Sequence, residues 1–304
     1  MDRPAAQARL RGSIAPLVTP FTEDDAIDEK ALKRLIRWHI EEGSHGLSVT
    51  GTTGEPSSLT LDERERMIAL LVEEAGGKVP TVPGTGTNNF KETLRLTRFA
   101  EREGADAALV IVPYYNRPSQ EGLYQYFRAL AEEVSLPLIL YNIPGRTALN
   151  LQPETLARLY DDCANIIGVK ESHTDLLQVS QEILLCPGIN VYSGIEALCY
   201  PMLALGGAGH VSATANLLPR ELARLYDLVA EGKHDEAREL HYRLLPLNVA
   251  LFLETNPGPL KTALGWMGEI HPRLRPPLVP PSGPNQERLR VAMAAWGLLG
   301  GGAA

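Results

Sequence analysis

Short apolar runs alternate along the chain with longer amphipathic stretches. The apolar runs are rich in Val, Ile, Leu, Ala and Gly and mostly lack a period of two, which is typical of strands buried on both faces. The amphipathic stretches repeat apolar residues at steps of three and four, which predicts helices. We expect strands at 12–20, 46–50, 79–84, 106–112, 137–142, 165–169, 190–194 and 207–213. We expect helices at 29–42, 62–74, 90–103, 121–133 and 153–160.

The rhythm of these elements predicts the fold class. Eight strand and helix alternations within about 230 residues match a (β/α)8 TIM barrel, an α/β fold, better than a doubly wound sheet, which usually has fewer strands. A doubly wound sheet that binds nucleotides would also need a glycine fingerprint. Neither 84–89 nor 206–209 completes that fingerprint or carries a P-loop lysine.

The last quarter of the chain breaks this rhythm. We expect residues 1–230 to form the barrel, with its catalytic lysine, and residues 231–304 to form a C-terminal helical extension. Helices are expected there at 235–248, 257–267 and 286–299. Five prolines predict a non-helical loop before the last helix: Pro276, Pro277, Pro280, Pro281 and Pro284.

Composition and charge exclude several classes of protein. The chain has 304 residues, of which 44% are hydrophobic and 22% are charged, as in an ordinary globular protein. Its formal net charge of −8 argues against a nucleic-acid-binding surface. No apolar stretch approaches the ~20 residues of a membrane span, and the first residues do not open a signal peptide. We therefore expect a cytoplasmic protein without nucleic-acid or membrane partners.

The cysteines and histidines indicate no metal site. The three cysteines, Cys163, Cys186 and Cys199, lack CxxC spacing, so we expect buried free thiols. The seven histidines are scattered and show no ligand spacing, which argues against a metal-dependent aldolase. No cofactor is expected.

Lys170 is the most informative single residue. It follows the apolar run 166–169 and precedes a stretch that resembles a helix start, so it stands at the C-terminal end of a buried strand. Burial disfavours the ammonium form, and a neutral amine can attack a ketone to form a Schiff base. A strand-end lysine that merely extends into solvent is the alternative.

Other polar residues follow neighbouring strands, where a barrel builds its active site. Residues 51–55 form a glycine-rich turn with two threonine hydroxyls and backbone N–H groups that could hold a small carboxylate. Residues 113–118 and 141–147 bring tyrosines and an arginine to the same rim. Such a rim can form an imine, move protons and bind anions.

These segments resemble the dihydrodipicolinate synthase and N-acetylneuraminate lyase family of pyruvate-dependent Schiff-base aldolases. The resemblance runs from about Gly12 to the C-terminal helices, with five segments in the family's order. They are Gly51-Thr52-Thr53-Gly54-Glu55, Pro113-Tyr114-Tyr115-Asn116-Arg117-Pro118, Tyr141-Asn142-Ile143-Pro144-Gly145-Arg146-Thr147, Gly168-Val169-Lys170-Glu171 and Asn256-Pro257.

The resemblance implies a role for each matching residue. Lys170 would form the imine with pyruvate and Tyr141 would donate and accept protons above it. Thr52 would link Tyr141 to Tyr115 of a neighbouring subunit, in a homotetramer built as a dimer of dimers. Thr53, Gly194 and Val211 would contact substrate. Glu55 is expected to be a helix cap or a brace of its loop.

The choice of acceptor depends on Arg146. In having an arginine at this position the chain resembles the synthase branch of the family, in which the arginine binds the carboxylate of aspartate semialdehyde. The lyase branch lacks this arginine. Ile195, Pro56 and Gly145 depart from the usual synthase pattern and indicate a slightly altered acceptor pocket. A related pyruvate aldolase or dehydratase for a sugar acid or an aromatic aldehyde is the alternative. A non-enzymatic sensor on this fold would be expected to lose Lys170 or Tyr141.

A second group of residues corresponds to the family's site for the inhibitor lysine. Its members are Ser57, Leu61, Arg64, Asn88, Glu92 and Tyr114. Leu61 and Arg64 replace residues that are often histidine in lysine-sensitive relatives. The resemblance therefore implies weak inhibition by lysine or none.

Overall fold

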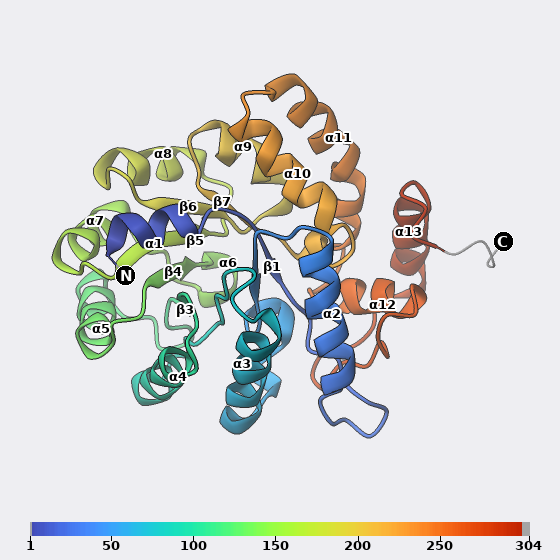
Figure 1. Ribbon diagram of the computed structural model, residues 1–304, viewed down its shortest axis with the longest axis horizontal. Helices are drawn as coiled ribbons and strands as arrows, with labels where there is room; N and C mark the ends of the chain where they lie inside the picture. The colour runs from blue at the N-terminus through green and yellow to red at the C-terminus, as the bar shows by residue number, and fades with distance from the viewer. Residues whose placement is uncertain (1, 300–304) are drawn as a thin grey trace.

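The computed structural model describes residues 2–299 and shows a curled parallel sheet surrounded by helices (Figure 1). Its seven strands have the order β2-β1-β7-β6-β5-β4-β3. They are β1 (Gly12–Pro16), β2 (Gly46–Ser48), β3 (Ala108–Ile111), β4 (Leu138–Asn142), β5 (Ile166–Glu171), β6 (Asn190–Ser193) and β7 (Gly209–Val211). Each lies within or next to an expected strand.

The expected strand at 79–84 closes the barrel between β2 and β3. It makes one parallel bridge to each neighbour, Leu47 with Thr81 and Gly84 with Leu109. Its prolines, Pro80 and Pro83, have no N–H to donate, so a regular ladder cannot form there. The fold is therefore the expected (β/α)8 barrel, with an eighth segment that is too irregular to count as a strand.

Helices pack around the outside of the barrel (Figure 1). They are α2 (Glu29–Glu41), α3 (Leu61–Ala75), α4 (Phe90–Glu103), α5 (Gln120–Glu133), α7 (Pro153–Asp162), α8 (Leu176–Leu185), α9 (Cys199–Ala204) and α10 (Pro219–Ala230). The first five match the expected helices within a few residues. Short turns lie at strand ends: η1 (Thr52–Gly54), η2 (Pro56–Ser58), α6 (Pro144–Thr147), η3 (Glu196–Leu198) and η4 (Ala213–Asn216).

The apolar side chains form two cores. A large core lies between the strands and the surrounding helices and includes Leu35, Leu71 and Val169. A smaller core fills the barrel itself and includes Ile139, Tyr141 and Ile167. Strands that supply both cores must be apolar on both faces, which explains why their sequences lack alternation.

An N-terminal helix that we did not expect, α1 (Arg3–Arg9), closes the N-terminal mouth of the barrel. Its Ala6, together with Leu10, belongs to the inner core. The Arg3 guanidinium donates hydrogen bonds to the carbonyl oxygens of Tyr160 and Cys163, at 2.5 and 2.6 Å. The opposite, C-terminal mouth of the barrel remains available for a site.

The C-terminal extension contains α11 (His234–Ala250), α12 (Gly258–Trp266) and α13 (Gly283–Ala294). Pro284 lies in the first turn of α13, so our expectation that it belongs to a non-helical loop is wrong. Proline is tolerated there because the first N–H groups of a helix have no partner within the helix. The large core continues from the barrel into α11 and α12, and the boundary at residue 230 stays a prediction.

Within residues 2–299, no helix has both the length and the apolar character needed to span a membrane.

Candidate active site

The pairing of β5 with β4 turns the side chain of Lys170 into the barrel. Ile166 and Gly168 pair with consecutive residues of β4, so Ile167 is an extra residue that bulges out of the ladder. Beyond this bulge Val169 packs in the outer core, and Lys170 faces the barrel interior. Bulges commonly redirect side chains near active sites. Lys170 is only 6% exposed, which excludes the alternative of a lysine that extends into solvent.

The glycine directly after the next strand, β6, leaves room for this lysine. A Cβ atom at Gly194 would lie 2.5 Å from Lys170 Cε and 1.9 Å from the hydroxyl oxygen of Ser172. The Gly194 N–H also donates to the carbonyl oxygen of Glu171 at 2.7 Å. Gly194 therefore borders Lys170 directly, as the resemblance implies for a residue of the substrate site. Val211 is buried in the inner core at the end of β7.

Tyr141 lies beside Lys170 and is connected to Thr52. Tyr141 and Lys170 are register partners on β4 and β5, and the ammonium nitrogen lies 4.1 Å from the centroid of the tyrosine ring. The phenol oxygen of Tyr141 lies 3.3 Å from Thr52 Oγ1, within hydrogen-bonding distance. The structure thus brings together an amine, a phenol and an alcohol, which is a chain able to move protons to a forming imine.

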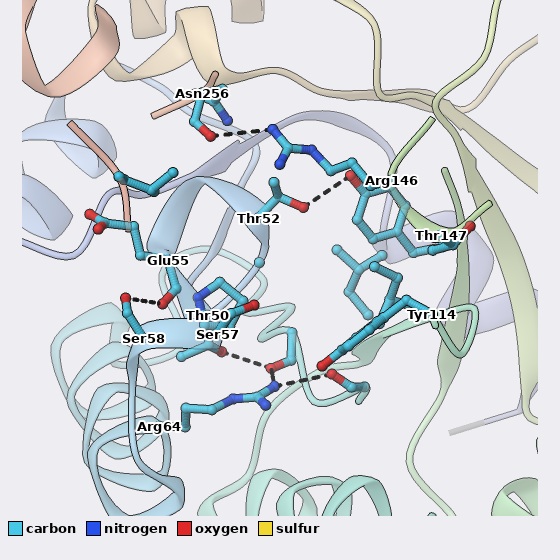
Figure 2. A pocket seen from close by; sticks show the side chains of 18 of the residues that line it. Thr50, Thr52, Glu55, Ser57, Ser58, Arg64, Tyr114, Arg146, Thr147 and Asn256 are labelled. Atoms are coloured by element: carbon cyan, nitrogen blue, oxygen red, sulfur yellow. Dashed lines mark hydrogen bonds between the residues drawn. The ribbon is translucent and has the colours of Figure 1, made fainter. Parts of the chain in front are cut away.

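The turn that carries Thr52 also connects to Arg146. Thr53 is buried, and its hydroxyl oxygen accepts a hydrogen bond from Asn256 Nδ2 at 3.1 Å. The Asn256 carbonyl oxygen accepts a hydrogen bond from the Arg146 guanidinium at 3.3 Å. Figure 2 shows Thr52, Arg146 and Asn256 around one cavity. Asn256 matched the family pattern, but we assigned it no role, because its contacts join segments far apart in the sequence.

A cavity of ≈ 320 Å³ at the C-terminal mouth of the barrel is lined by Thr52, Tyr141, Arg146 and Asn256, among others. One end is bordered by Tyr141, Arg146 and Thr147, and the other by Ser57 and Arg64. Arg146 is exposed to solvent in the single chain, so its guanidinium is available to an anionic group of a ligand. Lys170 is not among the lining residues, but its Nζ lies 4.1 Å from the ring centroid of Tyr141, which is.

Glu55 stabilises its loop, which is one of the two roles that we expected for it. The residue has a left-handed backbone with φ of 55° between the two turns η1 and η2. Its buried carboxylate accepts a hydrogen bond from Lys261 at 2.7 Å and from the backbone N–H of Arg275 at 3.2 Å. Glu55 is therefore occupied by protein partners and is not available as an acid catalyst.

Tyr115 does not reach the site within its own chain. Its side chain is 91% exposed and its backbone is left-handed, with φ of 72°. The Thr52 and Tyr141 link of the expected relay is present, and the link to Tyr115 is not formed in the single chain. A role for Tyr115 therefore requires a second subunit and remains a proposal.

The residues of the expected lysine site are only partly gathered at one place. Ser57, Arg64 and Tyr114 line the same end of the cavity, and Leu61 packs against the large core. The Arg64 guanidinium is buried and donates to the carbonyl oxygens of Gly84 and Gly86, at 3.0 and 3.3 Å. Burial lowers the pKa of Arg64 to about 10. The two remaining members, Asn88 and Glu92, do not line this cavity.

Glu196 is a buried carboxyl group that our sequence analysis gave no role. Its Oε1 accepts the backbone N–H of Ala213 at 2.7 Å. Burial raises its pKa to about 7, although the hydrogen bond from Ala213 and the charge of Lys170 act in the opposite direction. The isolated sequence Gly194-Ile195-Glu196 indicated an altered acceptor pocket, but it did not indicate a buried acid.

Behind β5, on the face away from the cavity, a carboxyl pair lies beside a histidine. Atoms of Glu171, His173 and Glu182 that could bind a metal lie within 4.8 Å of one another. The spacing of the histidines in the sequence gave no sign of this group. The backbone N–H of Asp175 donates to His173 Nδ1 at 3.1 Å, which leaves the ring proton on Nε2.

A protonated Nε2 cannot bind a metal, and it lies 2.6 Å from Glu171 Oε2. Burial raises the pKa of both carboxyl groups, that of Glu182 to about 10 and that of Glu171 to about 8, so the protonated forms are favoured at this place. Glu171 also accepts a hydrogen bond from Asn142 at 3.0 Å. The group is best described as a buried carboxyl pair in which burial favours the protonated forms.

Comparisons with known proteins identify the family to which the chain belongs. A family model described as the dihydrodipicolinate synthetase family matches residues 9–296. A 4-hydroxy-tetrahydrodipicolinate synthase of Thermus thermophilus is 49% identical over 293 residues, which cover 95% of this chain and 97% of that protein. The crystal structure of dihydrodipicolinate synthase from Aquifex aeolicus has a TM-score of 0.93 and 41% identity, and covers 95% of this chain and 99% of that chain. The chain therefore belongs to the dihydrodipicolinate synthetase family.

Proposed function

We propose that this protein condenses pyruvate with L-aspartate-4-semialdehyde to form 4-hydroxy-tetrahydrodipicolinate, on the route to diaminopimelate and lysine. The observation that carries the proposal is the buried Lys170, whose Nζ lies 4.1 Å from the centroid of the Tyr141 ring. An amine held in this way beside a proton carrier suits imine formation with a ketone. The names of the relatives point to the same reaction.

Each residue of the site has a defined task in this reaction. The Lys170 amine attacks the ketone of pyruvate, and loss of water gives the imine. Tyr141, linked to Thr52, carries the protons of this step and of the conversion of the imine to the enamine. The enamine carbon then attacks the aldehyde, and the amine of the acceptor displaces Lys170 as the product cyclises. The net reaction releases one water molecule and needs no cofactor.

The carboxylate groups of the two substrates need separate anchors. Thr53 and the N–H groups of its turn hold the pyruvate carboxylate, and Gly194 and Val211 border the bound imine. Arg146 holds the acceptor carboxylate through charge-assisted hydrogen bonds. The support for Arg146 is its exposed guanidinium at the mouth of the cavity, next to Asn256.

A panel of aldehydes tests the acceptor. The purified protein with pyruvate is assayed against aspartate semialdehyde, N-acetylmannosamine and glyceraldehyde, and the Arg146→Ala variant is assayed in parallel. We expect turnover of aspartate semialdehyde, and we expect the variant to raise its KM about ten- to a hundredfold while the pyruvate KM changes little, since a charge-assisted contact contributes ~1.5–3 kcal/mol. Preference for another aldehyde, or equal changes in both KM values, would contradict the proposed acceptor.

We also propose a cytoplasmic homotetramer, assembled as a dimer of dimers. The exposed Tyr115 supports assembly, because a tyrosine in this loop can complete the proton relay of a neighbouring chain. Leu177 and Leu184 on α8 are 67% and 77% exposed and support a second, apolar contact. All three cysteines are buried free thiols, as expected, which suits a reducing compartment.

A further inference from the structure

The turn proposed to hold the pyruvate carboxylate is supported from the C-terminal extension. The turn η1 carries Thr52 and Thr53, and Glu55 follows it with a left-handed backbone. Residues other than glycine adopt this conformation only when the surroundings stabilise it. The stabilising contacts come from α12 and the segment after it, more than 200 residues further along the chain.

Lys261 of α12 makes the central contact. Its ammonium group lies 2.7 Å from Glu55 Oε1, and the side chains of both residues are 0% exposed. The same ammonium group donates to the carbonyl oxygen of Thr19 at 2.8 Å, and its nitrogen lies 4.2 Å from the centroid of the Phe21 ring. These contacts fix the position of the Glu55 carboxylate relative to the barrel.

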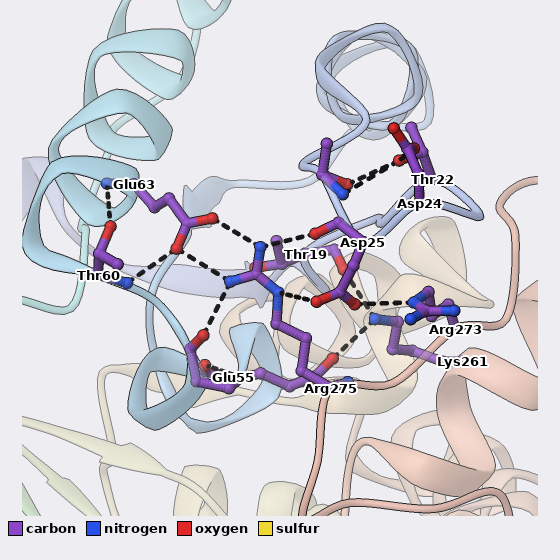
Figure 3. Close-up of polar contacts among 12 residues, drawn as sticks. Thr19, Thr22, Asp24, Asp25, Glu55, Thr60, Glu63, Lys261, Arg273 and Arg275 are labelled. Carbon is purple, nitrogen blue, oxygen red and sulfur yellow. Dashed lines mark hydrogen bonds and ion pairs between the residues drawn. The ribbon is translucent and has the colours of Figure 1, made fainter.

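Arg275 connects the same carboxylate to a second group of charges (Figure 3). The backbone N–H of Arg275 donates to Glu55 Oε2 at 3.2 Å. The Arg275 guanidinium binds Glu63 through two hydrogen bonds, at 2.6 and 2.9 Å, and also donates to the carbonyl oxygen of Ser58 at 2.8 Å. Glu63 caps the start of α3 through Thr60. Both carboxylate oxygens of Glu55 are therefore held by the C-terminal extension.

Stability alone does not explain a fully buried ion pair. Removing two charges from water is costly, and apolar side chains of similar volume often stabilise a protein as well or better. The positions of the two residues in the chain point to a more specific role for the pair. Glu55 directly follows η1, and Asn256, at the start of the same C-terminal segment, binds the Thr53 hydroxyl at 3.1 Å.

We propose that Lys261 is a positioning residue that acts through Glu55 to hold Thr52 and Thr53 where they bind the pyruvate carboxylate and contact Tyr141. This proposal rests on the proposed function. Lys261 itself does not touch substrate. Its loss would let the turn move, and small displacements of binding groups reduce rates strongly, by up to about a hundredfold for ~1 Å.

The decisive variant removes both charges. In the double variant Glu55→Gln, Lys261→Met neither residue of the pair is charged, and the glutamine oxygen can still accept a hydrogen bond from the Arg275 N–H. We expect this variant to fold, with a pyruvate KM raised about tenfold or more and a KM for the aldehyde acceptor that changes much less. In the single variant Glu55→Gln the one side-chain oxygen can accept a hydrogen bond from Lys261 or from the Arg275 N–H but not from both, so we expect a smaller rise in the pyruvate KM than in the double variant.

Arg66→Met provides the matched control, because it removes an exposed ion pair with Glu29 that links two barrel helices. We expect it to change neither KM. A folded double variant with the pyruvate KM of the unaltered protein would overturn the proposal. The proposal would also be overturned if the double variant failed to fold while the single variant kept unaltered kinetics, because the pair would then serve only the fold. Absence of a borohydride-trapped imine in the unaltered protein would instead overturn the proposed function.

Discussion

Tyr141 and Lys170 face each other across two neighbouring parallel strands, with the Lys170 nitrogen 4.1 Å from the centroid of the Tyr141 ring. The bulge at Ile167 is what turns Lys170 towards the barrel interior and gives it this neighbour. The phenol oxygen of Tyr141 in turn lies 3.3 Å from Thr52. The geometry therefore joins the proposed nucleophile to a proton carrier through strand register and does not depend on a mobile loop.

Gly194→Ala is expected to reduce imine formation strongly. The new methyl group would lie 2.5 Å from Lys170 Cε and closer still to Ser172, so the lysine must move. Gly283→Ala, at the start of α13, is the control, because a Cβ atom there meets nothing within 4 Å. We expect kcat to fall about tenfold or more for the first variant and to stay unchanged for the second. Equal activities in stopped assays at saturating substrate would contradict this account of how Lys170 is oriented.

Tyr115 is expected to act in a neighbouring subunit, because it is fully extended into solvent in its own chain. Tyr115→Phe should lower kcat by about two orders of magnitude or more, the contribution typical of general acid–base catalysis, and leave the fold intact. Mixing Tyr115→Phe with Lys170→Ala should restore partial activity if subunits exchange. A fully active Tyr115→Phe would show that the proton path does not include this residue.

L-Lysine is expected to inhibit weakly or not at all. Leu61 offers no hydrogen bond to a ligand, and the buried guanidinium of Arg64 repels an ammonium group placed nearby. Initial rates at saturating pyruvate should change little up to millimolar lysine. Half-inhibition below that range would mean that Arg64 binds the lysine carboxylate and that the inhibitor site is functional.

The Glu182→Gln variant is expected to be more stable than the unaltered protein, by a margin that grows as the pH rises. Burial raises the pKa of Glu182 to about 10 in the folded state, so between about pH 4.5 and 10 the folded state holds a proton that the unfolded state lacks, and stability falls with rising pH. Glutamine does not titrate, so the variant does not lose this stability as the pH rises. Urea unfolding should show similar stabilities near about pH 5 and an advantage of about 1–4 kcal/mol for the variant near about pH 8, at ~1.4 kcal/mol per pH unit.

Glu73→Gln serves as the control for this experiment, because Glu73 is an exposed carboxyl group on α3. Its stability should follow that of the unaltered protein at every pH. If the curves for Glu182→Gln and the unaltered protein were parallel, Glu182 would titrate alike in the folded and unfolded states, and a raised pKa in the folded state would be excluded.

The barrel was predictable because strands that serve two cores are apolar throughout, and because helices keep their periodicity wherever they cover the sheet. The position of Lys170 at a strand end could be predicted for the same reason. The bulge at Ile167 could not, since it is a property of the pairing between two strands. Helix α1 is short and carries few apolar residues, so its sequence did not reveal that it closes the barrel.

The residues that support the site could not be predicted from the sequence. Lys261 reads as an ordinary residue of an amphipathic helix, and its ion pair with Glu55 spans 206 positions of the chain. The same holds for Asn256, whose contacts with Thr53 and Arg146 appear only once the extension packs against the barrel. Matching segments identified the groups proposed to act on substrate, and the three-dimensional structure was needed to identify the residues that hold them.

Trapping the imine tests the central claim most directly. The protein is incubated with pyruvate and sodium borohydride, digested, and analysed by mass spectrometry, with Lys170→Ala treated in parallel. The account predicts inactivation and one reduced pyruvate adduct per chain, located on Lys170 and absent from the variant. An adduct on a different lysine, or full activity after treatment, would contradict it.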